Sequence, residues 1–324
     1  MTYPDDPSLS DRTSDTLTAA HLYYMQDLTM EAIARELHTS RSSVSRLLSQ
    51  ARTSGLVDIQ IRSPLDATSR VEQLIRDRFG VTAHVVPVPD HASDVDRLER
   101  VALSVARILG QFFDSNMIMG IAWGSTMNAV SRHVTPKRTH NAQIVQLNGA
   151  GNTRSTGLDY AHEILQRFGN AFGARLEQFP VPTFFDDPAT RTAYWRERGL
   201  RRLLEMQGNM DVALFSVGSP FSNVPSHVYV GGYLDANEFE ALSEAGVVGD
   251  VATVFYRADG STDGIPLNDR GTGPELSVLR RTPRRICVVS GKSKLNSLRG
   301  ALAANLITDL IIDESTARAL CDPA

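Results

Sequence analysis

Residues 28–61 read LTMEAIARELHTSRSSVSRLLSQARTSGLVDIQI, and two short helical patterns meet in this stretch at a short turn. In the first pattern Thr29 is a good N-cap, and Ile33, Ala34 and Leu37 recur at the spacing of one buried helix face. Two short helices joined by such a turn form a helix-turn-helix. The stretch therefore predicts how the first part of the chain folds.

The second helical pattern has one apolar face and one polar face. Thr39 or Ser40 would cap its start, and Gly55 would end it. The inward positions are Val44, Leu47, Leu48 and Ala51. This spacing leaves the arginines and serines of the opposite face free to contact solvent or the groove of a DNA duplex.

The sequence on either side completes a small domain. Helical spacing begins at Leu17 and predicts a helix before the turn, while apolar and polar residues alternate from Val57 to Ile61 as in a short strand. Residues 1–14 are rich in Asp, Pro and Ser and predict a disordered tail. We therefore expect a winged helix-turn-helix over residues 15–63.

The charge of this module differs from that of the whole chain. The net charge of −4 argues against a general polyanion-binding surface, so a nucleic-acid contact must come from a local patch. Residues 38–57 hold three arginines and no acid, whereas residues 1–37 hold seven acids and two arginines. The module is therefore predicted to bind DNA. The alternative is an ordinary three-helix packing unit whose arginines are only solvated.

The predicted DNA-binding residues lie on and just before the second helix: Thr39, Ser40, Arg41, Ser42, Ser43, Ser45, Arg46, Gln50 and Arg52. A recognition helix enters the major groove by its N-terminal part, so the candidate base readers are Arg41, Ser42, Ser43 and Ser45. Arg46, Gln50 and Arg52 would contact phosphates. His38 stands where such a turn usually has a glycine with positive φ, and histidine tolerates that conformation at a modest cost.

Cysteine usage and hydropathy indicate the cellular setting. Cys287 and Cys321 are the only cysteines, too few for a disulfide scaffold and without the spacing of a zinc site. The start of the chain lacks a signal-peptide pattern, and no stretch reaches the length of an uninterrupted membrane span. We therefore expect a soluble cytoplasmic protein with no metal and no membrane partner.

Residues 64–324 are predicted to form one larger α/β domain that begins with a linker helix over residues 64–80. Apolar strand candidates lie at 83–88, 117–122, 144–147, 176–181, 212–217, 247–256, 286–289 and 310–312. Helical segments separate most of them, and the longest runs from about Val95 to Phe113. This alternation predicts a Rossmann-like, mostly parallel sheet covered on both faces, with ligands bound beyond the carboxyl ends of its strands.

Glycine-rich loops adjoin several of these strands. Gly120–Thr126 ends a strand and opens a helix, where backbone amides and two hydroxyls would hold a phosphate. Asn148–Asn152, Val217–Ser219 and Ser290–Lys294 follow other strands, and Gly246–Asp250 precedes one. A glycine after a strand is more often only a turn. The convergence of these loops on one sheet edge nevertheless favours a ligand site.

With these motifs the chain resembles the SorC family of bacterial sugar-sensing transcriptional regulators, also called the deoxyribonucleoside and central glycolytic gene regulator group. The resemblance covers nearly the whole chain and rests on Ser40–Leu48, Gly120–Thr126, Gly246–Asp250 and Gly291–Ala317. It implies a sugar-phosphate-isomerase-like domain that binds an effector and forms a homo-oligomer, often a tetramer. It also implies that a small phosphorylated sugar or polyol controls affinity for double-stranded operator DNA.

The resemblance also implies roles for single residues. Gly124, Ser125 and Thr126 match the family's phosphate-cradling loop, Asp250 would accept hydrogen bonds from sugar hydroxyls, and Lys294 would neutralise the phosphate. Asn148 stands where some bisphosphate-sensing relatives have a basic residue, which argues against a second phosphate. The predicted effector-binding residues are Gly120, Trp123, Gly124, Ser125, Thr126, Asn148, Gly149, Gly218, Asp250 and Lys294.

Two other functions are compatible with the sequence. One is a sugar-phosphate isomerase or deaminase with an added DNA-binding module, and the other is a DNA-bridging protein whose large domain only oligomerises. An enzyme would need a general base, and no histidine is set against a carboxylate in the glycine-rich loops. His162 and His227 lie nearest and are more typical of surface or core histidines. We therefore expect a regulator with no catalytic residues and no cofactor.

Overall fold

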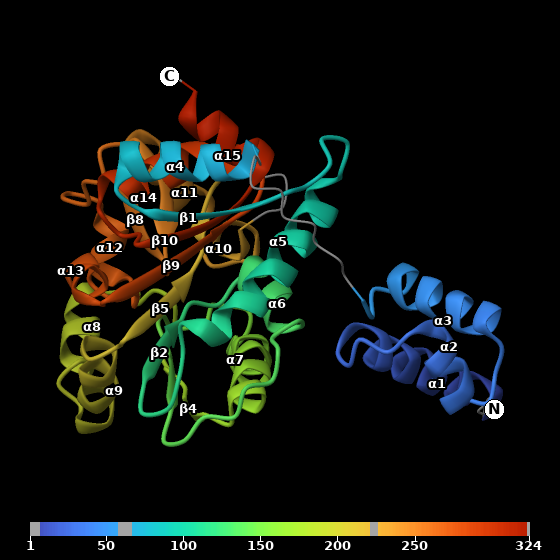
Figure 1. Cartoon of the computed structure of the whole chain (residues 1–324). Coiled ribbons are helices and arrows are strands. Elements are labelled where there is room, and N and C mark those ends of the chain that lie inside the picture. Colours follow the sequence, from blue (N-terminus) through green and yellow to red (C-terminus); the bar gives the residue numbers. More distant parts are fainter. Residues whose placement is uncertain (1–6, 58–66, 221–225, 323–324) are drawn as a thin grey trace. The chain divides into compact units, whose positions relative to one another are not determined.

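The structure is a computed structural model, and it describes residues 7–57, 67–220 and 226–322. The chain divides into two compact units, with the boundary between Asp66 and Ala67. Figure 1 shows the chain coloured from the N-terminus to the C-terminus. The predicted boundary, after residue 63, lies three residues earlier in the chain.

The first unit contains helices α1 (Pro7–Tyr24), α2 (Met30–Glu36) and α3 (Arg41–Thr53). The Thr29 hydroxyl accepts a hydrogen bond from the Ala32 amide, and the Ser40 hydroxyl accepts one from the Ser43 amide, which confirms the predicted caps. The buried core consists of Ala19, Leu22, Ile33, Ala34, Val44 and Leu48. His38 has a φ of 48° in the turn between α2 and α3, as predicted. The helix-turn-helix is therefore confirmed.

The predicted tail and the predicted wing strand of this unit have different outcomes. Helix α1 begins at Pro7, so the prediction of a disordered tail is wrong for residues 7–14. Proline is well tolerated in the first turn of a helix, and no proline or glycine follows before Tyr24, so nothing local stops the helix. Most of the predicted wing strand lies outside the described residues.

The second unit is built on a seven-stranded sheet in which every neighbouring pair is parallel. The strand order is β1-β10-β9-β5-β2-β3-β4. The strands are β1 (Thr82–Val86), β2 (Ile118–Ile121), β3 (Gln143–Gln146), β4 (Arg175–Glu177), β5 (Val212–Phe215), β9 (Arg284–Val289) and β10 (Asp309–Asp313). The predicted parallel sheet is therefore confirmed.

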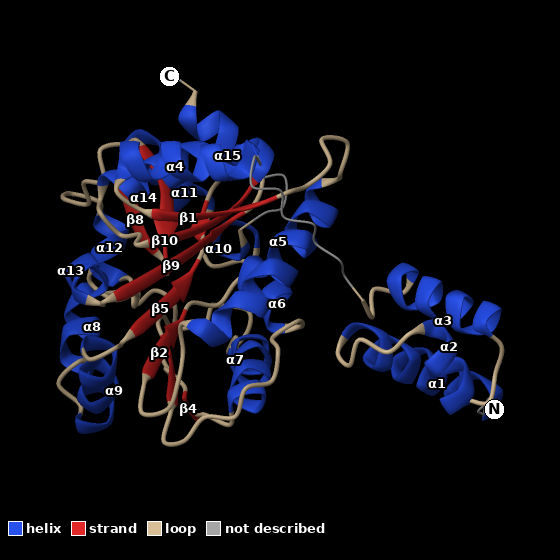
Figure 2. Ribbon diagram, viewed as in Figure 1, coloured by secondary structure: helices blue, strands red, loops and turns tan. Residues whose placement is uncertain are grey.

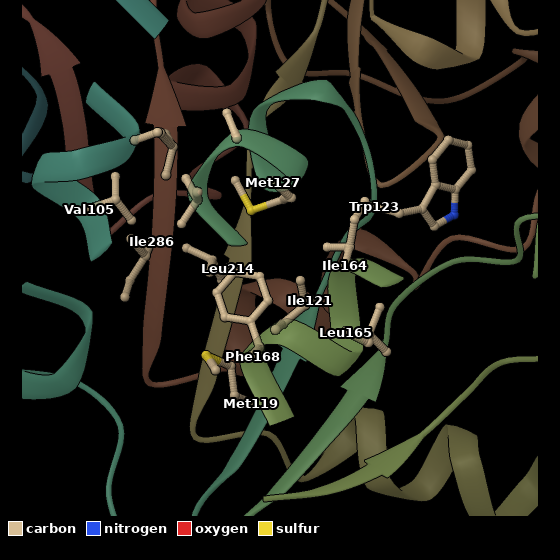
Figure 3. Close-up of a cluster of buried hydrophobic side chains, with 14 of the residues drawn as sticks. Val105, Met119, Ile121, Trp123, Met127, Ile164, Leu165, Phe168, Leu214 and Ile286 are labelled. Carbon is tan, nitrogen blue, oxygen red and sulfur yellow. The ribbon is translucent and has the colours of Figure 1, made fainter. Parts of the chain in front are cut away.

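Helices cover both faces of this sheet, and Figure 2 shows them on either side of the strands. One buried cluster joins α5 (Asp94–Ile108), α6 (Ser125–Ser131) and α7 (Leu158–Phe172) to the sheet through the side chains in Figure 3. The opposite cluster joins α4 (Ala67–Phe79), α14 (Leu295–Ala303) and α15 (Glu314–Cys321). Because both faces are buried, the middle residues of the inner strands are apolar, as Ile144 and Val145 are in β3 and residues 310–312 are in β10.

The remaining elements are shorter or lie outside these layers. They are η1 (Leu109–Gln111), α8 (Pro188–Tyr194), α9 (Arg198–Gly208), α10 (His227–Val230), α11 (Ala236–Glu244), α12 (Pro266–Arg270), α13 (Leu276–Arg281) and η2 (Lys292–Lys294). Trp195 packs with Phe179 and Phe185 beside α8 and α9. It belongs to that small cluster, as expected for a packing tryptophan.

A second, antiparallel sheet corrects the prediction of one strand over residues 247–256. It contains β6 (Val217–Gly218), β7 (Val247–Val251) and β8 (Val254–Arg257) in that order. Ala252 and Thr253 form the turn between β7 and β8 with φ values of 48° and 66°. Neither residue type is typical of a left-handed turn, so the sequence carried no signal for it.

Strand order places the cavity of the second unit. Along the chain, β2, β3 and β4 are added on one side, whereas β5, β9 and β10 are added on the other. The direction therefore reverses between β2 and β5, which are hydrogen-bonded neighbours. A switch point of this kind leaves a crevice at the carboxyl ends of the strands, where open α/β sheets bind ligands.

Candidate functional site

Helix α3 presents the predicted DNA-binding residues of the first unit. The exposed members are Ser40, Arg41, Ser42, Ser45, Arg46, Gln50 and Arg52, whereas Thr39 and Ser43 are half-buried. Val44, Leu48 and Ala51 are buried on the opposite side of the helix. The amphipathic spacing therefore places the polar set on one accessible surface. Their contact with DNA stays a prediction.

Little of the charge on this surface is used inside the unit. The Arg41 guanidinium lies 2.8 Å from the Glu31 carboxylate, and the two side chains are 66% and 60% exposed. An ion pair this exposed contributes little free energy, so Arg41 can leave it for a phosphate or a base. Arg46 donates only a long hydrogen bond of 3.5 Å to the Ser42 carbonyl. Ser40 is committed to the cap of α3, and its hydroxyl is less available for DNA.

A small cavity of about 50 Å³ lies at the carboxyl edge of the parallel sheet. Eight predicted residues line it: Trp123, Gly124, Ser125, Thr126, Asn148, Gly218, Asp250 and Lys294. Loops from widely separated parts of the chain thus converge as the sheet rule predicts. Two predicted residues, Gly120 and Gly149, are not among the described lining residues.

The two exceptions have packing roles. Gly120 lies inside β2, where an added Cβ would stand 2.0 Å from the Met210 sulfur. Gly149 lies behind the cavity wall, and its carbonyl accepts hydrogen bonds from the Trp123 indole at 2.9 Å and the Thr183 hydroxyl at 2.8 Å. These glycines therefore permit close packing of the elements that carry the site.

Lys294 brings a buried positive charge to the cavity. Lys294 is the last residue of the η2 turn, and the residue is only 5% exposed. The ammonium donates hydrogen bonds to the hydroxyls of Thr126 and Ser216, each at 3.3 Å. Burial lowers the pKa of Lys294 to about 8, partly offset by the charge of Asp250. In the described part of the chain, no carboxylate lies within ion-pair distance of this ammonium.

Asp250 is the buried acid of the cavity. One carboxylate oxygen accepts a hydrogen bond of 3.0 Å from the Thr253 amide, while Oδ1 is buried and has no partner among the described residues. Burial raises the pKa of Asp250 to about 6. An added Cβ on Gly218 would stand 1.8 Å from Oδ1, so this position must be glycine. The hydroxyl of Tyr229 is close enough to influence Asp250 but does not reach hydrogen-bond geometry.

Trp123 and Asn148 form another part of the wall. The Trp123 indole N–H is committed to the carbonyls of Asn148 and Gly149, which holds the ring in one orientation. The Asn148 side-chain oxygen is buried and has no partner among the residues that the structure describes. A buried acceptor without a donor is unfavourable, so a hydroxyl group of a ligand would stabilise this position.

The N-terminus of α6 faces the same cavity. Gly124 is the N-cap residue with a φ of 148°, and no side chain caps the helix. The first amides of a helix have no partner inside the helix. Gly124, Ser125 and Thr126 all line the cavity. Their amides and hydroxyls are therefore placed on the same side as the Lys294 ammonium.

His227 is a lining residue that the sequence did not identify. Its ring stacks on Tyr160 with centroids 4.6 Å apart and lies 5.8 Å from the Trp123 ring. Burial lowers the pKa of His227, which favours the neutral imidazole. The expectation of an ordinary surface or core histidine is compatible with this packing, although α10 also brings His227 to the cavity.

Ser216, Ser226 and Thr253 also line the cavity and were not predicted. Ser216 directly follows β5, so a stricter use of the carboxyl-end rule would have found it. Thr253 lies in the unpredicted turn between β7 and β8, and no local signal pointed to it. The described residues contain no cluster of three or more His, Cys, Asp or Glu side chains that could hold a metal ion. Within the same residues, no helix is long and apolar enough to cross a membrane.

Sequence comparison assigns a family to each unit. The Sugar-bind family model, which describes a sugar-binding domain, matches residues 63–322, and the MarR family model matches residues 12–67. The deoxyribonucleoside regulator of Bacillus subtilis is 33% identical over 94% of this chain and 96% of its own length. The sorbitol operon regulator of Klebsiella pneumoniae is 26% identical over 93% of this chain and 95% of its own length. These relatives are transcriptional regulators and not enzymes.

Solved structures agree with this assignment. A domain of a "possible sugar-binding transcriptional regulator" from Arthrobacter aurescens TC1 is 55% identical, with a TM-score of 0.75, over 81% of this chain and all of that chain. The full-length sorbitol operon regulator of Klebsiella pneumoniae has a TM-score of 0.80 over 99% of this chain and all of that chain; at 23% identity it supports the fold alone. The chain therefore belongs to the SorC family of sugar-binding transcriptional regulators, as its DNA-module and cavity motifs had suggested.

Proposed function

We propose that the cavity binds a small phosphorylated sugar or polyol and that this binding changes the affinity of helix α3 for operator DNA. The observation that carries the proposal is the environment of Lys294. Its ammonium is buried at a cavity wall, and its partners there are neutral hydroxyls. A buried charge is costly unless an opposite charge accompanies it, so an anionic ligand is the natural complement.

A phosphate fits this environment better than a simple carboxylate. A lysine ammonium has three donors, and two of them reach Thr126 and Ser216, which leaves one for a ligand. The uncapped N-terminus of α6 offers backbone amides beside it, and helix N-termini favour groups with several anionic oxygens. Ser125 adds a further hydroxyl at the same wall. Several donors of different kinds therefore converge on one anion.

The rest of the wall suits a polyhydroxylated ligand. Asn148 has a buried oxygen without a donor among the described residues, and Asp250 Oδ1 has only the Tyr229 hydroxyl nearby, outside hydrogen-bond geometry. Sugar and polyol hydroxyls donate hydrogen bonds, so they would satisfy both oxygens. Relatives of this chain include regulators named for deoxyribonucleosides, sorbitol and erythritol. We infer that the effector belongs to the same chemical class.

The response to the effector requires only two states with different affinities. An effector that binds the DNA-competent and incompetent states unequally shifts their populations, and no chemical reaction is needed. We propose that a homo-oligomer, a tetramer, binds the operator in the cytoplasm. Helix-turn-helix proteins commonly read paired half-sites with symmetry-related subunits, which supports an oligomer.

A ligand panel tests the proposed effector class. Ribose 5-phosphate, sorbitol 6-phosphate and glycerol 3-phosphate are compared with the unphosphorylated ribose, sorbitol and glycerol by thermal unfolding of the full chain. A ligand at about 100 times its Kd should stabilise the protein by roughly 3 kcal/mol. We expect a phosphorylated compound to stabilise most.

The two neighbouring lysines provide a matched pair of variants. Lys294→Met should remove the stabilisation by the phosphorylated compound, whereas Lys292→Met should retain it, because Lys292 is exposed and does not line the cavity. Stabilisation by free sugars alone would contradict the role of phosphate. An equal loss of ligand-induced stabilisation in both variants would show that Lys294 does not contribute more to ligand binding than Lys292 does.

A further inference from the structure

Asp313 is a buried carboxylate at the carboxyl end of β10, outside the residues that line the cavity. Its side chain is fully buried. Oδ2 accepts a hydrogen bond of 2.9 Å from the Gly291 amide. Oδ1 accepts hydrogen bonds from the Ser315 hydroxyl at 2.8 Å and the Thr316 amide at 3.1 Å. The Arg97 guanidinium completes the set with an ion pair of 3.0 Å.

These partners belong to separate elements of the second unit. Gly291 is the N-cap of the η2 turn that ends at Lys294, and it has a φ of 93°. Thr316 lies in the first turn of α15, and Arg97 comes from α5. Asp313 therefore fastens the turn that carries the cavity lysine to the start of one helix and the side of another. A displacement of the η2 turn would break or strain these hydrogen bonds.

Helix α15 in turn packs against α4, and Figure 1 shows the two helices side by side. The Arg78 guanidinium of α4 donates a hydrogen bond of 3.0 Å to the carbonyl of Cys321 at the end of α15. Helix α4 begins at Ala67, the first residue of the second unit. A continuous set of contacts thus leads from Lys294 to the helix nearest in sequence to the DNA-binding unit.

We infer that Asp313 is a positioning residue that couples occupation of the Lys294 cavity to α15 and α4. The inference rests on the proposed anion site at Lys294. An anion that draws the ammonium toward itself pulls on the η2 turn. Because Gly291 and the start of α15 share one carboxylate, α15 responds to that pull. Helix α4 follows through its contact with α15, including Arg78.

Hydrogen–deuterium exchange of the full chain, with and without excess inorganic phosphate, tests this coupling. Phosphate should slow exchange in the η2 turn, in α15 and in α4. Protection confined to η2 would overturn the coupling and leave the proposed anion site standing. No protection at η2 would contradict the anion site, and this inference would fall with it.

Two exposed arginines on α4 supply a matched comparison. Arg78→Met removes the contact with Cys321, whereas Arg76→Met removes an exposed charge for which the structure shows no contact with α15. In Arg78→Met, phosphate should still protect η2 and α15 but should protect α4 less than in the unchanged protein, because only the apolar packing of α15 on α4 remains. Arg76→Met should behave as the unchanged protein does. Equal behaviour of the two variants would rule out the contact as a link.

Asp313→Asn tests the carboxylate itself. It retains an acceptor oxygen but loses the charge that pairs with Arg97 and the second acceptor for Gly291. A purely structural role would raise exchange equally with and without phosphate, so the measured quantity is the difference that phosphate makes. We expect that difference to disappear in α15 and α4. Its persistence in a folded Asp313→Asn protein would overturn the inference, and the Arg78 comparison remains informative if this variant does not fold.

Discussion

Helix α3 and the cavity around Lys294 both carry positive charge, but they hold it in opposite environments. The Arg41 side chain is exposed and pairs loosely with Glu31, whereas Lys294 is buried and its ammonium donates hydrogen bonds to the hydroxyls of Thr126 and Ser216. Water screens the first charge at little cost, while the second is retained against a desolvation penalty. The charged side chains of the DNA-binding surface therefore contribute little to the free energy of folding, whereas the charge in the cavity opposes folding.

Removal of the two leading arginines of α3 should have the largest effect. If each contact contributes 1–3 kcal/mol, Arg41→Ala combined with Arg46→Ala should weaken binding to a promoter fragment by roughly 100-fold or more. Thermal stability should hardly change, because both side chains are exposed. Fluorescence anisotropy with labelled DNA measures the first quantity, and thermal unfolding measures the second.

Arg281→Ala serves as the control for this prediction, since it removes an exposed arginine from the second unit. It should leave DNA affinity unchanged. Comparable losses in the control and in the α3 variant would mean that affinity follows total charge and not the surface of α3.

Replacement of the buried Lys294, in contrast to the two α3 arginines, should change the stability of the protein. At pH 7 the Lys294 ammonium is charged although burial lowers its pKa to about 8, so the folded state carries an unfavourable charge. Lys294→Met should therefore raise the free energy of unfolding of the ligand-free protein, on the order of 2 kcal/mol. Urea unfolding measures this change, with Lys292→Met as the control. A lower stability of Lys294→Met would show that the ammonium stabilises the empty cavity.

The pH dependence separates the two sites further. The pKa of Lys294 is lower in the folded protein than in the unfolded chain. Between pH 8 and 10.5 the unfolded chain therefore binds more protons at this residue. The contribution of Lys294 consequently makes the free energy of unfolding rise with pH over this range. Above pH 8 the free cavity loses its positive charge. Affinity for ribose 5-phosphate should therefore decline above pH 8, whereas guanidinium groups in general stay protonated over this range. Calorimetric titration from pH 7 to pH 9 would reveal a flat profile if Lys294 does not bind the anion.

The turn between β7 and β8 should give the smallest effect. Ala252 and Thr253 both have positive φ, which is strained for residues with a Cβ and more so for a β-branched one. Changing the pair to Asn-Gly should stabilise the ligand-free protein by about 1 kcal/mol, because these residues favour this turn. Thr253 lines the cavity, so effector affinity should fall in the same variant. An unchanged urea midpoint would show that the turn stores no strain.

The two regions also differ in how far the sequence could predict them. Helix α3 is a local structure, because its cap Ser40, its buried residues and Gly55 lie within a few helical turns of one another. Apolar periodicity and capping residues were therefore enough to predict it from the sequence. The prediction was wrong at the start of α1, because the polar composition of residues 7–14 does not prevent a helix. The parallel sheet was equally accessible, because its apolar strands recur between helices.

The sequence predicted lining residues that lie in a loop or turn after a parallel strand, as Trp123, Asn148 and Lys294 do. His227 and Thr253 were missed because tertiary packing brings them in from elements without a recognisable motif. Gly120 was assigned to the site although its missing side chain makes room for Met210. A glycine-rich motif shows that something packs closely but does not distinguish a ligand from a neighbouring side chain.

The fixed indole of Trp123 has a practical consequence. The chain has two tryptophans, and the other, Trp195, packs in a cluster beside α8 and α9 and does not line the cavity. With its N–H tied to two carbonyls, the Trp123 ring cannot turn away when the wall beside it changes. A Trp195→Phe protein would carry one built-in fluorophore whose emission reports cavity occupancy without any attached dye. Effector titrations and DNA titrations could then be followed in the same cuvette.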